Sequence, residues 1–137
     1  MKTRIEDIAT IIASAIWADN VYDEAEKITV EEIADALELN EAAFKKAVDA
    51  QLKAMSKMSD NHANAALMDA AEAVDDEEIG IVFEAAMQML LADGELSVSE
   101  VSNLLVVANA LGIEEEMAIL LLADMVKTEP ELAIEIK

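Results

Sequence analysis

Residues 17–40 read WADNVYDEAEKITVEEIADALELN, and they align without a gap with residues 91–114, LADGELSVSEVSNLLVVANALGIE. The offset of 74 residues pairs Asp19 with Asp93 and Glu26 with Glu100. In each copy an apolar run ends at the first aspartate, and a glutamate follows seven residues later. The alignment therefore predicts two matching helix–turn–helix corners within one internal repeat.

The apolar runs that precede the corners support the same repeat. The run over 8–18 is interrupted only by Thr10 and Ser14, and the run over 82–92 only by Glu84 and Gln88, at the same positions plus 74. Because residues at i and i+4 share one helix face, we expect equivalent roles in two halves. Each half is too short to bury a sufficient core alone. We expect one domain with pseudo-twofold symmetry, with half-repeats at about 5–56 and 76–127, a hinge at about 56–64 and a peripheral tail at 128–137.

Composition predicts an all-α fold. The 137 residues are 55% apolar, with three Gly, one Pro and no Cys, and the commonest residue types favour helix. No stretch alternates as a strand does. We expect seven helices, at 5–18, 24–37, from the N-cap Asn40 onward, 65–74, 77–92, 97–111 and 114–127. Asp75 and Glu78 suggest a capping box for the fifth helix, which we expect at the buried centre, and Trp17, aligned with Leu91, is expected in the core.

The charge of the chain is strongly acidic. The formal net charge is −21, and residues 58–124 contain fifteen Asp and Glu but no Lys or Arg. Such a surface excludes binding to nucleic-acid phosphates and repels anionic membranes. It suits the binding of cations, the binding of a basic partner protein, or simple solubility. No apolar run approaches the roughly 20 residues of a membrane span, and acids interrupt the first residues where a leader would be apolar. We expect a cytoplasmic protein without membrane insertion.

The corners have a purely structural interpretation. Each offers a residue for a left-handed helix end, an N-cap and a capping-box glutamate, which are Asn20, Asp23 and Glu26 in the first and Gly94, Ser97 and Glu100 in the second. Asp19 and Asp93 are left unexplained, because an acid in the last turn of a helix faces the negative end of the helix dipole.

The alternative interpretation is a cation site. The second corner is similar to the latter half of an EF-hand loop, but Met89 and Leu91 stand where that loop needs its first acids, so an EF-hand is excluded. If the pseudo-twofold brings the corners together, their acids could form one all-oxygen site for Ca²⁺, Mg²⁺ or Mn²⁺. Its candidate ligands are Asp19, Glu26, Asp93 and Glu100, with Asp23 and Glu95 nearby.

No motif points to an enzyme. The chain lacks Cys, a Ser/His/Asp set, a phosphate-binding Gly loop and a Glu-x-x-His motif, and its single histidine, His62, is expected on the surface. A second non-enzymatic possibility is an acidic helical adaptor, or a mimic of nucleic-acid charge, that binds a protein with a basic surface. The run 120–122, Leu-Leu-Leu, indicates either burial between layers or a homodimer interface.

The second corner resembles the tellurite-resistance TerB-like family in the run Ala92-Asp93-Gly94-Glu95-Leu96-Ser97, in Glu100, and in Ala110-Leu111-Gly112-Ile113. In that family an A-D-G-x-[IVL]-S turn and a downstream Glu recur in two halves of a helical domain. The resemblance covers roughly residues 5–126, although Asn20 stands at the first corner where the family has Gly. It implies a compact helical fold, acids gathered from both corners, divalent-metal binding and a role in tellurite or other stress responses.

Overall fold

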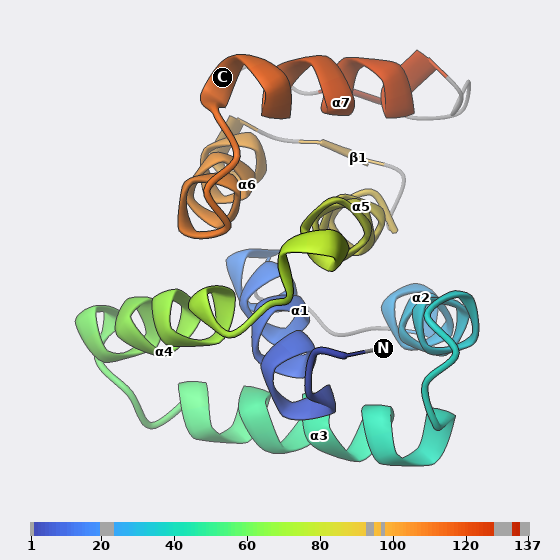
Figure 1. Cartoon of the computed structure of the whole chain (residues 1–137), viewed down its shortest axis with the longest axis vertical. Helices are drawn as coiled ribbons and strands as arrows, with labels where there is room; N and C mark the ends of the chain where they lie inside the picture. The colour runs from blue at the N-terminus through green and yellow to red at the C-terminus, as the bar shows by residue number, and fades with distance from the viewer. Residues whose placement is uncertain (1, 20–23, 93–94, 97, 128–132, 135–137) are drawn as a thin grey trace.

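Figure 1 shows the fold as a computed structural model, which describes residues 2–19, 24–92, 95–96, 98–127 and 133–134. Over these residues the chain forms seven α-helices, one 3-10 turn and two strands of two residues each, packed as a single domain around one core. The all-α prediction is confirmed. The elements are α1 (Ile5–Asp19), α2 (Glu24–Ala36), α3 (Glu41–Met55), α4 (Asp60–Glu72), η1 (Asp76–Glu78), α5 (Ile79–Leu90), β1 (Glu95–Leu96), α6 (Val98–Ala110), α7 (Glu115–Lys127) and β2 (Ala133–Ile134).

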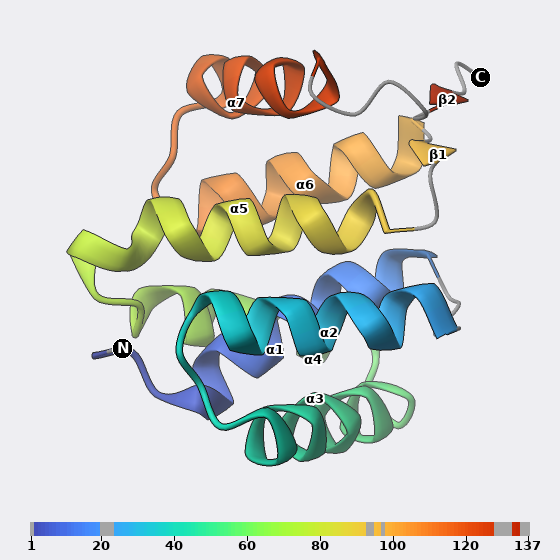
Figure 2. The ribbon, with the colours of Figure 1, turned by 90° about the vertical axis from the view of Figure 1, so that its right-hand side faces the viewer.

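Helix α1 lies at the centre of the fold. It contacts α3, α4, α5 and α6, and Figures 1 and 2 show it between α3 and α5. Every residue from 7 to 13 is buried, because the alanines and isoleucines of this stretch allow other helices to pack on several sides. Helix α5 also has an extensive buried face, but Ile81 and Glu84 on it are exposed. The central position expected for α5 therefore belongs to α1.

The helices of the two halves begin at a constant interval. Helices α1, α2 and α3 begin at residues 5, 24 and 41, and α5, α6 and α7 begin at residues 79, 98 and 115, each 74 residues later. The packing differs between the halves, since α3 packs on both α1 and α2 whereas α7 packs mainly on α6. Helix α4, which packs on α1 and α6, has no helical counterpart among the described residues of the second half.

Helices α2 and α6 end in the same way. The residue after each final turn has left-handed backbone, with φ of 58° at Glu38 and 79° at Gly112. The same backbone hydrogen bond of 2.8 Å then closes each helix, from the N–H of Leu39 to the carbonyl of Ala34 and from the N–H of Ile113 to the carbonyl of Ala108. This is the six-to-one bond of a Schellman cap. The correspondence of α2 with α6 is thus one of backbone geometry as well as sequence.

Two local predictions are wrong. Helix α4 begins at Asp60 rather than at residue 65, because the hydroxyl of Ser59 accepts a hydrogen bond of 3.2 Å from the N–H of His62 and starts the helix earlier. Trp17 is 39% exposed rather than in the core, and it lines a small cavity between α1, α4 and α6. His62 is exposed, as expected.

The capping box expected before α5 does not form. Asp75 caps the 3-10 turn η1, where its carboxylate accepts a hydrogen bond of 3.0 Å from the N–H of Glu77. Glu78 accepts instead from the N-terminal segment, at 2.8 Å from the N–H and 2.6 Å from the hydroxyl of Thr3 and at 2.9 Å from the N–H of Lys2. The local pattern is overridden by a contact with residues more than 70 positions away.

These bonds predict a pH dependence of stability. The Thr3 hydroxyl and two backbone N–H groups donate to the ionised Glu78 carboxylate and hold its pKa below the usual value. A carboxyl whose pKa is lower in the folded than in the unfolded protein stabilises the fold above the unfolded pKa of about 4.3, and this contribution is lost as the pH falls through the folded pKa.

We therefore expect Glu78→Gln to lower the free energy of unfolding at pH 7, and the difference from wild type to shrink below pH about 4.3. Urea unfolding from pH 7 to pH 3 measures it. Glu77→Gln is the matched control, because the neighbouring Glu77 carboxylate pairs with Lys2 only at the surface. Equal pH profiles for the two variants would contradict the assignment.

The C-terminal tail contacts the second corner. Strand β2 pairs in parallel with β1, with Ala133 opposite Glu95 and Ile134 opposite Leu96. The sequence gives no alternation that predicts either strand, since each has only two residues. Within the tail, which we expect to be peripheral, the described residues Ala133 and Ile134 therefore pair with the second corner.

Candidate functional site

The helix ends on either side of the two corners lie at one end of the molecule. The C-terminal ends of α1 and α5 and the N-terminal ends of α2 and α6 all lie at the right of Figure 2. Helix α5 contacts α1, α2 and α6, and it lies between α2 and α6 in both Figures 1 and 2. The first turns of α2 and α6, which carry the candidate glutamates, therefore lie on either side of α5.

Glu26 and Glu100 are the two candidate ligands whose side chains the structure describes. They are only 2% and 5% exposed, although most acids of the chain are on the surface. Each is the third residue of its helix, the position of a capping-box glutamate. A carboxylate there lies at the positive end of the helix dipole, which is a favourable position for an acidic residue. The structure thus places the matched pair in equivalent buried environments.

Burial recurs along α2 and α6 beyond these glutamates. If Glu26 or Glu100 is counted as the first position, the side chains at the fifth, eighth, ninth and twelfth positions are buried in both halves, each pair separated by 74 residues. The pairs are Val30 with Leu104, Ile33 with Val107, Ala34 with Ala108, and Leu37 with Leu111. The apolar stripe anchors both helices in the core, and it orients each first turn so that its glutamate points inward.

The other four candidate ligands are not placed as side chains. Asp19 is the last residue of α1 and Glu95 the first residue of β1, while Asp23 and Asp93 lie outside the described residues. Within the part of the chain that is described, no three acidic or histidine side chains form a group able to hold a metal ion. The shared site therefore remains a prediction that depends on these four acids.

A second candidate surface lies on α7. Met117, Ile119 and Leu120 on this helix are 52%, 47% and 64% exposed, and the acids 114–116 at its start are exposed as well. The leucine run 120–122 is divided, because Leu122 is buried while Leu120 faces outward. Apolar side chains beside acids fit a protein-binding surface.

No protein-family model, no curated protein and no solved structure matches this chain. No helix among the described residues combines the length and apolar character needed to cross a membrane. The assignment of the corners therefore depends on their own residues, burial and backbone geometry.

Proposed function

We propose that the chain is a cytoplasmic, non-enzymatic, TerB-like acidic domain that binds a divalent cation at its paired corners, in a tellurite or stress-response setting. The observation that carries this proposal is the burial of Glu26 and Glu100 at matched positions in the two halves. A buried carboxylate is stable only when hydrogen bonds or an opposite charge offset its lost hydration. The helix N-terminus is a favourable position for a carboxylate, and a cation bound at the corner would stabilise the buried pair further.

The chemistry of the candidate ligands selects the cation. All six are carboxylates, and the chain contains no Cys and a single His. Oxygen ligands suit Ca²⁺, Mg²⁺ and Mn²⁺ better than Zn²⁺. The high density of negative charge also raises the local concentration of cations around the domain.

The alternative is an acidic protein-interaction module, an adaptor or charge mimic, whose corners are only helix caps. The exposed apolar side chains of α7 beside the acids at 114–116 favour it. In that case Glu26 and Glu100 act through hydrogen bonds to the backbone, and a chelator leaves the stability of the protein unchanged. The two functions therefore predict different effects of Glu26→Gln and Glu100→Gln on the response of the protein to a cation.

Thermal unfolding of chelator-treated protein separates them. At a concentration a hundred times the Kd, the bound cation should add about 2.7 kcal/mol to the free energy of unfolding. Glutamine can still make the capping-box hydrogen bond, but it does not supply the negative charge that a divalent cation needs. We therefore expect Glu26→Gln with Glu100→Gln to fold and to lose the cation response.

Glu24→Gln is the matched control, because Glu24 lies in the same first turn of α2 and is exposed. It should keep the full response at fixed ionic strength. If all variants respond alike to Ca²⁺, Mg²⁺ and Mn²⁺, the effect is general charge screening and the corners are caps.

A further inference from the structure

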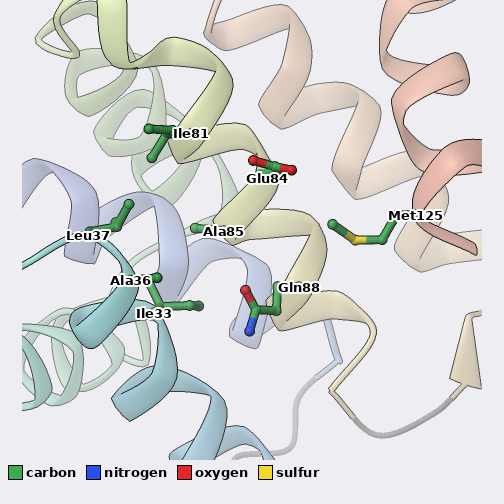
Figure 3. Close-up of a pocket in the computed structure, with 8 residues that line it drawn as sticks. All are labelled: Ile33, Ala36, Leu37, Ile81, Glu84, Ala85, Gln88 and Met125. Atoms are coloured by element: carbon green, nitrogen blue, oxygen red, sulfur yellow. The ribbon is translucent and has the colours of Figure 1, made fainter. Parts of the chain in front are cut away.

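A groove crosses the outer face of α5. It has a volume of about 290 Å³ and is lined by Ile33 and Ala36 of α2, by Leu37 just after that helix, by Ile81, Glu84, Ala85 and Gln88 of α5, and by Met125 of α7. Figure 3 shows α2 on one side of α5 and Met125 pointing toward α5 from the other side. The four α5 residues recur at i, i+3, i+4 and i+7, so they form a single stripe along the helix.

The matching face of α1 is covered. The α1 counterparts of Ile81 and Glu84, 74 residues earlier, are Asp7 and Thr10, which are 8% and 7% exposed. Glu84 by contrast is exposed, and Ile81 beside it is 46% exposed. The two halves thus have the same helix face in two states, covered on α1 and open on α5.

Helix α4 lies over part of this face of α1. Ser14, the counterpart of Gln88, lines a small cavity together with Ala63, Asn64 and Leu67 of α4. Helix α4 buries Leu67, Ala70 and Ala71, at the spacing of one helix face. No described helix takes this place over α5, because α7 packs mainly on α6. The shape left open on α5 therefore fits an α-helix with small apolar side chains.

Charge identifies the kind of helix. None of the eight described lining residues is Lys, Arg or His, and Glu84 lies in the groove. On α2 beside the groove, the carboxylate of Glu32 accepts a hydrogen bond of 3.3 Å from the side-chain amide of Gln88. A second copy of this chain would bring another net charge of −21 to the same surface. The groove favours a partner with Lys or Arg beside its apolar face.

We propose that the groove over α5 binds a basic amphipathic helix of a partner protein, in the place that α4 occupies over α1. The apolar face of that helix packs on Ile81 of α5, between Ala36 of α2 and Met125 of α7. Its basic residues lie beside Glu84 and Glu32. This surface is separate from the corner acids, so binding does not require a cation.

A labelled peptide tests the proposal by fluorescence anisotropy with the full chain in chelator. The probe copies the 13 residues of α4 and carries Lys in place of its three acids, Asp60, Asp69 and Glu72. We expect saturable binding that Glu84→Lys in the protein weakens about tenfold, because an attraction becomes a repulsion. Asp69→Lys in the protein makes the same change of charge on the exposed surface of α4, and it should alter the affinity less than about twofold.

A second variant tests the shape of the groove without changing charge. Ala36 is an exposed residue in the wall of the groove, so the Ala36→Gln variant should fold normally. The longer side chain should narrow the groove and lower the affinity for the peptide. Equal weakening by Glu84→Lys and Asp69→Lys would reduce the binding to general attraction between opposite charges and overturn the proposal. Absence of saturable binding, equal affinity for the unmodified acidic α4 peptide, or occupation of the groove by a second copy in sedimentation would overturn it too.

Discussion

Replacing Phe83 by alanine is expected to lower the free energy of unfolding by about 3–5 kcal/mol. Phe83 is fully buried on the inner face of α5, where that helix packs on α1. Removal of the ring loses its transfer free energy and leaves a cavity that the surrounding helices fill only in part. For a domain of 137 residues this corresponds to a fall in Tm of about 10–17 °C.

Ile81→Ala is the control for Phe83→Ala, because Ile81 lies two residues earlier on the same helix and is 46% exposed. It should cost about 1 kcal/mol or less, since alanine favours helix and little buried surface is lost. Urea unfolding of both variants measures the difference. Similar losses for the two would mean that α5 does not present the inner and outer faces described here.

Glu26→Lys is expected to cost about 3–5 kcal/mol, the scale seen when a buried charge loses its compensation. The substitution places a positive charge at a position only 2% exposed and at the positive end of the α2 dipole. Burial and the helix dipole both destabilise the variant, because burial penalises an unpaired charge and the positive end of the dipole repels a cation. The loss should appear with or without a divalent cation.

Glu24→Lys separates burial from the dipole. It reverses the same charge in the same turn of α2, but at an exposed position, so it should cost only about 0.3–1 kcal/mol. Thermal unfolding of the two variants at one ionic strength makes the comparison. If Glu24→Lys costs as much as Glu26→Lys, the burial of Glu26 contributes nothing and the corner is held by the dipole alone.

Local patterns in the sequence predict the helices well where the partners are nearby. Asn40 is an example, since its side-chain oxygen accepts a hydrogen bond of 2.9 Å from the N–H of Ala43 and begins α3 as expected. Glu78 shows the limit of such reasoning. Its spacing from Asp75 satisfies a capping box, yet its carboxylate binds Thr3, a contact that only the packed structure brings about.

The repeat predicts which corner residues are equivalent, but it does not predict which of the surrounding helix faces are exposed. The offset of 74 residues pairs Glu26 with Glu100, and both are buried at the third residue of a helix. It also suggests equal roles for Thr10 and Glu84, and here the halves differ, because one is buried and the other exposed. Which face a neighbouring helix covers depends on the packing of α4 and α7, and a repeat in sequence does not encode it.

Titration calorimetry of chelator-treated protein with Mn²⁺, at fixed ionic strength, tests the central claim most directly. We expect saturable binding by the wild-type chain and by Glu24→Gln, and loss of that binding in the double variant Glu26→Gln with Glu100→Gln. A titration without saturable binding, or one that the double variant leaves unchanged, would contradict a cation site at the paired corners.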